Sequence, residues 1–199
     1  MNFLAHIYLA RHSQQAMVGA LLGDFNPGQA IHAMPPEMAR EIHLHRLVDS
    51  YTDTHPQVLQ CKALFPDGVR RFSGIVLDVY FDYLLSQHWH RYSAIARTQL
   101  IADFYQALTQ LQAYLPGSLQ NLRSRMISQD WLGSYAEVAG LRLAVQRTSQ
   151  RLSRHGERLQ LALALAEQHH DQLETAFLEF FPELERYVSV QRQILLQAV

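Results

Sequence analysis

Apolar residues recur along most of this chain at the three- and four-residue spacing of an amphipathic helix. Leu, Ala, Gln, Glu and Arg, which favour helices, dominate these segments, and no segment shows the alternating β-branched pattern of a strand. The predicted helices are residues 2–12, 13–24, 36–53, 56–65, 69–90, 97–114, 118–129, 134–153, 156–180 and 182–198. The pattern therefore predicts an all-α protein, built as a bundle of many helices.

Capping and helix-breaking residues set several of these boundaries. Ser13 is a typical N-cap for the second helix, and the segment FNPGQ at 25–29 reads as a turn. Pro36 suits the first turn of the helix it begins, and Pro182 is expected to open the last helix. A kink is expected at Gly74. Because there is no repeat, low-complexity tract or evident linker, we expect one α-helical domain spanning residues 1–199.

Composition narrows the classes of function. The formal net charge is −1, which argues against general nucleic-acid binding. Cys61 is the only cysteine, so no intrachain disulfide or cysteine-based zinc site is expected, and a reducing cytoplasm fits. The first residues make a poor signal peptide, and no run reaches the roughly 18 apolar residues of a membrane span. We expect a cytoplasmic protein that does not enter the membrane; its oligomeric state is left open.

The basic residues are almost all arginines, and seven of the sixteen arginines lie in one segment. Within residues 123–158 they are Arg123, Arg125, Arg142, Arg147, Arg151, Arg154 and Arg158. One interpretation is a solvated helix face paired with the acidic segment 167–185. The other is a docking surface for an acidic partner. The sequence leaves both open.

Histidines and aspartates gather in four apolar clusters within the first ninety residues. The clusters read NFLAH, LLGDF, IHLHRLVDSYTD and LDVYFDYLLSQHWH. An ionised carboxylate is costly to place among apolar residues unless an opposite charge compensates it. The clusters contain few Arg or Lys, whereas a divalent metal would compensate the carboxylates. The clusters therefore predict a metal-dependent hydrolase.

Helical spacing shows how such a centre can be assembled. His45 and Asp49 are one turn apart on a predicted helix, so they share a face, and Asp78 with Asp82 makes a second pair of this kind. The residues that can converge from four segments are His6, Asp24, His45, Asp49, Asp78 and Asp82. Imidazole and carboxylate without thiolate suit Mn²⁺, Fe²⁺, Zn²⁺ or Mg²⁺ and do not choose among them.

Simpler interpretations exist for individual residues. An isolated His or Asp on an apolar helix usually makes a hydrogen bond inside the core. Asp53 can cap the helix that follows it, and His88 lies near a helix C-terminus, where a cationic side chain is favourable. The joint pattern of the four clusters is what favours a metal centre over these alternatives.

The same segments carry a resemblance to a known family. NFLAH, LLGDF, IHLHRLVDSYTD, LDVYFDYLLSQHW and, near the end, LETAFLEFFP resemble acyl carrier protein phosphodiesterase, from residue 2 to Pro182. The resemblance implies a helical fold related to the HD-type metal phosphohydrolases. It also implies hydrolysis of holo acyl carrier protein, an acidic protein substrate, to apo protein and free 4'-phosphopantetheine. A divalent metal, preferably Mn²⁺, is implied as the cofactor.

The resemblance also implies site residues. The family's positions fall on His6, Asp24, His43, His45, Arg46, Asp49, Asp53, Asp78, Asp82 and His88. In the resulting hypothesis the metal ligands are His6, Asp24, His45, Asp49 and Asp78, and Asp24 also counts as catalytic. Arg46 contacts the phosphate. Asp53 and Asp82 support the ligands or act as general base, and His43 or His88 protonates the leaving serine.

Two other functions stay open at this point. A centre of the same composition can serve a phosphohydrolase that acts on a nucleotide or another small phosphodiester. The second alternative is a non-catalytic helical module that binds carrier proteins. It predicts no stoichiometric metal and tolerance of alanine at Asp24, Asp49 and Asp78.

Overall fold

The computed structural model of this chain describes residues 1–25, 28–152 and 155–197, and every regular element in these ranges is a helix. The all-α prediction is therefore confirmed. The α-helices are α1 (Phe3–Leu9), α2 (Gln14–Leu22), α3 (Pro36–Thr54), α4 (Pro56–Ala63), α5 (Ser73–Gln87), α6 (Trp89–Tyr92), α7 (Arg97–Gln110), α8 (Gly117–Ser128), α9 (Trp131–Ser134), α10 (Val138–Arg151), α11 (Gly156–Gln168) and α12 (His170–Gln197). Short 3₁₀ helices are η1 (Gly23–Phe25), η2 (Gly28–Ala33), η3 (Arg70–Phe72) and η4 (Gln112–Tyr114).

Two of the predicted helix starts are present as expected. The backbone N–H of Ala16 donates to the Ser13 hydroxyl at 3.0 Å, so Ser13 caps α2. Pro36 occupies the first turn of α3, where its missing N–H costs nothing. The turn predicted at FNPGQ falls partly on residues 26 and 27, which lie outside the described residues.

The predicted helix at 69–90 is divided into three. The 3₁₀ turn η3 precedes α5, and α6 follows it after a break at His88. Gly74 lies in the first turn of α5, next to the helix start at Ser73. The break at His88 matters for the site because it ends the helix that carries Asp78 and Asp82.

The prediction that Pro182 opens the last helix is wrong. α12 runs continuously through Pro182, and the break from α11 falls at His169. A proline inside a helix costs about 3 kcal/mol through its lost hydrogen bond and ring clash. Phe180, Phe181 and Leu184 around it are fully buried, each worth roughly 1.5–3 kcal/mol. Burial of these side chains therefore outweighs the local cost of the proline.

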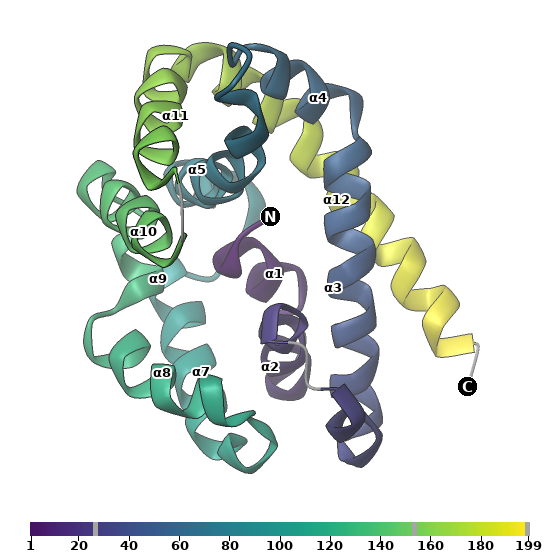
Figure 1. Cartoon of the computed structure of the whole chain (residues 1–199). Coiled ribbons are helices and arrows are strands. Elements are labelled where there is room, and N and C mark those ends of the chain that lie inside the picture. Colours follow the sequence, from purple (N-terminus) through teal and green to yellow (C-terminus); the bar gives the residue numbers. More distant parts are fainter. Residues whose placement is uncertain (26–27, 153–154, 198–199) are drawn as a thin grey trace.

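Helix α1 lies near the centre of the molecule (Figure 1). All its residues from Leu4 to Leu9 are buried, which is typical of a helix enclosed on every side. α2 packs against α1, α3 and α7, while α5 contacts α1 from the other side and α12 runs along α3. One hydrophobic core extends from Met1 to Val188. Among the described residues, no helix is both long and apolar enough to cross a bilayer.

Candidate metal centre

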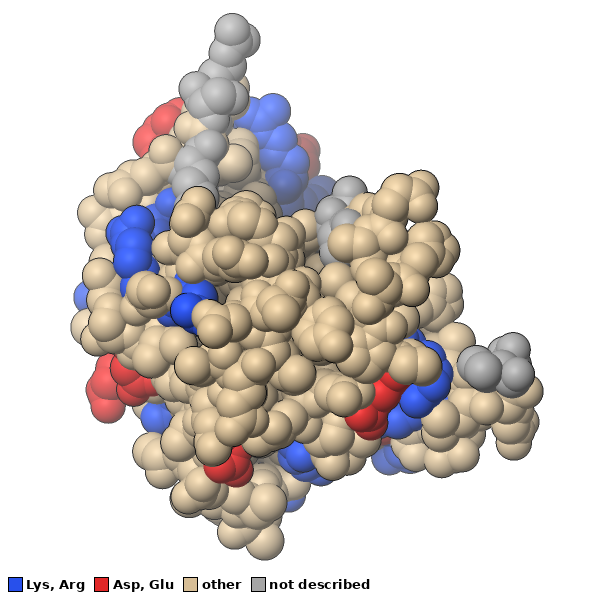
Figure 2. Space-filling model, turned by 90° about the horizontal axis from the view of Figure 1, so that it is seen from below, with Lys and Arg blue, Asp and Glu red and all other residues tan. Residues whose placement is uncertain are grey.

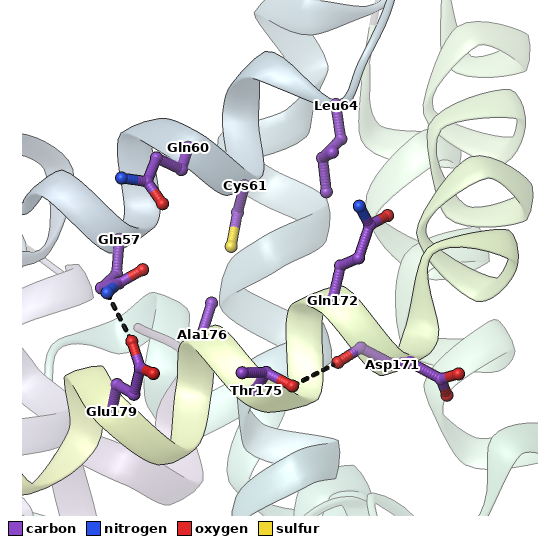
Figure 3. Close-up of a pocket in the computed structure, with 9 residues that line it drawn as sticks. All are labelled: Gln57, Gln60, Cys61, Leu64, Asp171, Gln172, Thr175, Ala176 and Glu179. Carbon is purple, nitrogen blue, oxygen red and sulfur yellow. Dashed lines mark hydrogen bonds between the residues drawn. The ribbon is translucent and has the colours of Figure 1, made fainter.

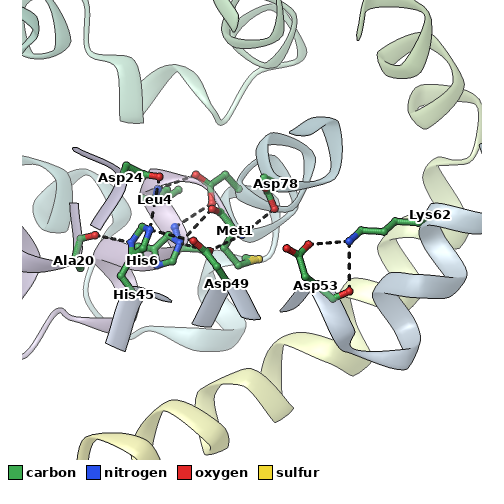
Figure 4. Close-up of polar contacts among 12 residues, drawn as sticks. Met1, Leu4, His6, Ala20, Asp24, His45, Asp49, Asp53, Lys62 and Asp78 are labelled. Atoms are coloured by element: carbon green, nitrogen blue, oxygen red, sulfur yellow. Dashed lines mark hydrogen bonds and ion pairs between the residues drawn. The ribbon is translucent and has the colours of Figure 1, made fainter. Parts of the chain in front are cut away.

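Five predicted ligands from four elements converge beside the N-terminal end of α1 (Figure 4). His6 comes from α1, Asp24 from η1, His45 and Asp49 from α3, and Asp78 from α5. α3 contributes two of them because His45 and Asp49 are one turn apart and share a face. α5, which carries Asp78, packs on α1, and η1, which carries Asp24, packs on α2 and α3, so the fold itself brings the clusters together.

The two histidines and Asp49 form the core of the cluster. His6 Nε2 lies 3.1 Å from Asp49 Oδ1, and His45 Nε2 lies 3.1 Å from Asp49 Oδ2. The two imidazole rings stack with centroids 3.8 Å apart. One ligand atom from each residue lies within 4.8 Å of the others. Because metal–ligand bonds of about 2.0–2.2 Å place neighbouring ligand atoms about 3–4 Å apart, these three residues can hold one cation.

Asp24 and Asp78 lie at the edges of this core. Asp24 Oδ1 is 3.6 Å from His45 Nε2. Asp78 Oδ1 is 2.8 Å from the α-amino nitrogen of Met1, which is also 3.4 Å from Asp49 Oδ1. Burial lowers the pKa of this amino group, but the carboxylates of Asp78 and Asp49 outweigh burial and raise it to about 10. A positive charge is thus favoured between the two carboxylates.

The orientation of His45 also fits a cation. Its Nδ1 lies 2.7 Å from the carbonyl oxygen of Ala20, which can only accept, so Nδ1 must carry a proton. In the neutral ring, Nε2 then directs its lone pair toward the carboxylates of Asp24 and Asp49, an arrangement that needs a proton or a metal ion between them. A backbone carbonyl on the far nitrogen is the usual support of a metal-binding histidine.

The ionisation of the cluster follows from these contacts. Burial lowers the pKa of His45, but its hydrogen bonds to Asp24 and Asp49 outweigh burial and raise the pKa to about 9. Burial and the charge of His45 lower the pKa of His6. Burial raises the pKa of Asp49, yet hydrogen bonds from His45 and His6 hold it well below its usual range. Asp49 is therefore an anion at neutral pH, as a metal ligand must be.

The centre is buried on one side and open on the other. The side chains of His6 and His45 are 2% and 3% exposed, whereas those of Asp49 and Asp78 are each 42% exposed. The imidazoles therefore face the core, and the carboxylates border solvent. The carboxylate side is therefore the side that a ligand can reach.

Asp82 lies behind the centre and contacts the backbone of α1. Its carboxylate accepts the N–H groups of Leu4 at 2.7 Å and Ala5 at 3.0 Å, and it is fully buried. Asn2 at the N-cap position makes no side-chain capping bond, so α5 supplies the cap of α1. Burial raises the pKa of Asp82 to about 7, against the opposing effect of these two hydrogen bonds.

Three of the predicted catalytic residues lie on the exposed side of α3. His43, Arg46 and Asp53 all face solvent. Arg46 is one turn before Asp49, so it borders the open side of the centre. Asp53 accepts a hydrogen bond from Lys62 Nζ at 2.8 Å (Figure 4).

The prediction that Asp53 caps the following helix is wrong, whereas His88 lies at the C-terminal end of α5 as expected. The N-cap of α4 is His55, whose Nδ1 accepts the N–H of Gln57 at 3.3 Å, rather than Asp53, which lies inside α3. His88 is hydrogen-bonded to Glu174 of α12 at 2.7 Å. No contact among the described residues joins His88 to the cluster.

Two backbone groups of the cluster are absent from the sequence prediction. They are the α-amino group of Met1 and the carbonyl oxygen of Ala20. A free α-amino group belongs to the first residue of a chain whatever its type, and every residue carries a carbonyl, so residue type gives no signal for either group. Only the packing of α2 on α3 and of α1 on α5 reveals their role.

The arginine-rich segment is spread over several helices. Arg142 pairs with Glu167 of α11 at 2.8 Å, as expected for a solvated face beside acidic residues. Arg158 donates to the carbonyl of Gly68 at 2.8 Å. Arg154 and the side chain of Arg151 lie outside the described residues. Seen from below, basic and acidic groups are scattered over a largely uncharged face (Figure 2).

A cleft lies away from the centre, between α4 and α12 (Figure 3). Its volume is about 490 Å³, and Cys61, Leu64 and Ala176 form its apolar part. Asp171 and Glu179 place carboxylates on its wall. None of the predicted site residues lines this cleft.

The fold and the cluster define an all-α protein with a histidine–carboxylate centre suited to a divalent cation. Residues 1–184 match the family described as acyl carrier protein phosphodiesterase. The chain belongs to this family.

Curated relatives cover almost the whole chain. The protein named acyl carrier protein phosphodiesterase from Yersinia pestis is 35% identical over 190 residues, which cover 94% of this chain and 96% of that protein. Its namesake from Escherichia coli O6:H1 is 33% identical over 187 residues, covering 92% and 95%. The one from Pectobacterium atrosepticum is 33% identical over 193 residues, covering 96% and 100%. No solved structure matches this chain.

Proposed function

We propose that this chain is a metal-dependent phosphodiesterase that hydrolyses holo acyl carrier protein to apo protein and free 4'-phosphopantetheine. The family and the curated relatives supply the reaction and the substrate. The observation that carries the metal requirement is the convergence of His6, His45 and Asp49 within one coordination distance. Their approach from two helices agrees with a centre that the fold maintains.

The proposed metal ligands are His6, Asp24, His45, Asp49 and Asp78, and the proposed ion is Mn²⁺. The donor set of imidazole and carboxylate fits Mn²⁺ and also Mg²⁺, Fe²⁺ or Zn²⁺. When bound, a divalent cation supplies Lewis acidity, which polarises the phosphate and makes water more acidic. The buried imidazoles orient the site, and the half-exposed carboxylates leave room for the phosphodiester.

Residues around the ligands have supporting roles in this proposal. Arg46 is exposed one turn before Asp49, where a guanidinium can bind two phosphate oxygens and stabilise charge that develops on them. His43 presents an exposed imidazole one turn before Arg46 on α3. We assign to His43 the protonation of the leaving serine. His88 is already hydrogen-bonded to Glu174. Asp82 acts through α1, whose N-terminus it holds.

The carrier protein needs a docking surface in addition to the centre. We assign this to Arg123 and Arg125 of α8, because arginines attract an acidic protein over long distances. Arg142 is left out, since it pairs with Glu167. The continuous core supports one hydrolase domain over residues 1–199, and the single buried Cys61 fits a cytoplasmic location. The proposed metal ligands lie on several helices, which agrees with the proposed relation to HD-type phosphohydrolases.

The test is a mass measurement on holo acyl carrier protein incubated with the purified protein. We expect the mass of the 4'-phosphopantetheine arm to be lost with Mn²⁺ and kept with EDTA. The control variant is Asp67→Ala, which removes an exposed aspartate paired with Arg70 and keeps every proposed site residue. It should bind Mn²⁺ like the wild type.

Two results would contradict the proposal. Hydrolysis of nucleotide or other small phosphodiesters without any effect on holo acyl carrier protein would favour the first alternative. No turnover and no stoichiometric metal in the folded protein would favour the non-catalytic module.

A further inference from the structure

A small cleft adjoins the metal centre between the start of α1 and helices α5, α9 and α10. Its volume is about 80 Å³, enough for several water molecules. Asn2 and Val79 line it, and each directly follows a residue of the centre, Met1 and Asp78 respectively. Because consecutive Cα atoms are about 3.8 Å apart, the cleft begins close to the centre.

The lining of this cleft includes hydrogen-bonding side chains: Asn2 just before α1, Tyr135 just after α9, and Arg147 of α10. The side-chain amide of Asn2 donates to the Tyr135 hydroxyl at 3.0 Å, and among the described residues the hydroxyl proton has no acceptor. Tyr135 is buried, and burial raises the pKa of its hydroxyl, so the proton is present at neutral pH. Arg147 donates from one nitrogen to Gln129 at 2.7 Å and keeps other N–H groups for a ligand.

Apolar groups form the rest of the lining. Phe3, Val79 and Trp131 contribute aromatic or aliphatic surface, and the Arg147 guanidinium lies 4.7 Å from the centre of the Trp131 ring. This contact holds the guanidinium in place without consuming its in-plane donors. The cleft therefore suits a ligand that combines apolar carbon groups with oxygen acceptors and carries no positive charge.

The pantetheine arm has this chemistry. Next to its phosphate it carries a carbon with two methyl groups, followed by a hydroxyl and an amide carbonyl. We infer that the cleft receives this phosphate-proximal part of the arm, with Phe3 and Trp131 beside the methyl groups and with Tyr135 and Arg147 donating to the oxygens. The inference rests on the proposed function, since the arm reaches the cleft only when its phosphate is at the centre.

The larger cleft between α4 and α12 is a poorer candidate for the arm. Asp171 and Glu179 on its wall repel the phosphate that the arm carries. Neither cleft is lined by a residue of the centre, but the small cleft begins one residue from Met1 and from Asp78, and the larger one has no such neighbour.

The experiment compares Arg147→Ala with Arg142→Ala. Both substitutions remove an arginine from α10, but Arg142 is exposed and pairs with Glu167 outside the cleft. Calorimetry on the Mn²⁺-loaded protein measures the Kd of free 4'-phosphopantetheine and of inorganic phosphate. Loss of charged hydrogen bonds predicts a 4'-phosphopantetheine Kd about 10- to 100-fold higher in Arg147→Ala. We expect an unchanged phosphate Kd, and wild-type values in Arg142→Ala.

Tyr135→Phe provides a second variant that keeps the buried ring. It should raise the Kd for 4'-phosphopantetheine several-fold with an unchanged far-ultraviolet circular dichroism spectrum. The inference is overturned if both cleft variants bind 4'-phosphopantetheine as Arg142→Ala does. It is also overturned if Arg147→Ala weakens phosphate binding equally, because Arg147 would then contact the phosphate.

The inference and the proposed function fail in different ways. If the wild-type protein leaves holo acyl carrier protein intact, the proposed function fails. If it cleaves the substrate while the cleft variants retain normal affinity for 4'-phosphopantetheine, only the assignment of the cleft fails.

Discussion

Replacement of Asp82 by alanine tests how the centre is held in place. α1 has only 7 residues, and a helix of this length has little stability of its own. The carboxylate of Asp82 accepts the N–H groups of Leu4 and Ala5 at the start of α1. All three residues are fully buried, so water cannot replace these hydrogen bonds. Asp82→Ala therefore leaves two buried donors without acceptors, and His6 lies in the next turn of the same helix.

The expected loss follows from the two hydrogen bonds. Each buried donor left without a partner costs about 1–3 kcal/mol, so Asp82→Ala should lower the free energy of unfolding by about 2–6 kcal/mol near pH 5. A typical urea slope of roughly 2 kcal/mol/M converts this into a midpoint lower by about 1–3 M. Urea unfolding followed by circular dichroism measures it.

The pH dependence of this loss has a defined sign. Burial raises the pKa of folded Asp82 to about 7, above its unfolded value of 3.8, so the folded state binds the proton more tightly between these limits. Stability from this group is complete below the unfolded pKa and is lost as the pH rises through about 7. Between pH 3.8 and about 7, the free energy of unfolding of the wild type should fall by roughly 1 kcal/mol per pH unit relative to that of Asp82→Ala. The difference in free energy of unfolding between the wild type and Asp82→Ala should therefore become smaller as the pH rises.

Asp53→Ala is the matched control. Asp53 is an exposed aspartate paired with Lys62, and an exposed pair of this kind contributes at most about 1 kcal/mol. If Asp82→Ala were no less stable than Asp53→Ala near pH 5, Asp82 would not hold α1. An unchanged difference between pH 4 and pH 7 would refute the role of burial.

Other predictions concern the ligands and the docking surface. Asp24→Ala and Asp49→Ala should each abolish turnover of holo acyl carrier protein while the helical circular dichroism signal stays the same; full turnover in both would remove them from the site. Raising the salt concentration from about 0.05 to 0.5 M should raise KM for the carrier protein several-fold with little change in kcat, because the arginines act at long range. A KM that does not respond to salt would refute electrostatic docking.

Helical periodicity was the basis for predicting the fold class and part of the metal centre. The all-α class follows from it, and so does the shared face of His45 and Asp49, because spacing within one helix fixes the direction of a side chain. Asp78 and Asp82 show the limit of this rule. They point to the same side of α5, yet Asp78 reaches the Met1 amino group and Asp82 reaches the backbone of α1. Spacing gives direction along a helix and leaves the partner on the neighbouring helix undetermined.

Contacts between distant segments explain what the sequence did not predict. Nothing in the local sequence indicates a partner for His55, but α12 places Glu183 at 3.2 Å from its Nε2. Glu174 likewise engages His88 from far along the chain. Pro182 is a strong local signal for a helix start, yet the buried Phe180 and Phe181 keep α12 continuous. In each case tertiary packing outweighs local preference.

The most direct test of the account is turnover by metal-stripped protein titrated with Mn²⁺. Wild-type protein freed of metal should leave holo acyl carrier protein intact, and added Mn²⁺ should restore cleavage to a plateau. Asp49→Ala should gain no cleavage at any Mn²⁺ concentration, because Asp49 contacts both histidines. Full cleavage by the metal-stripped wild type, or Mn²⁺-dependent cleavage by Asp49→Ala, would contradict a metal centre built on His6, His45 and Asp49.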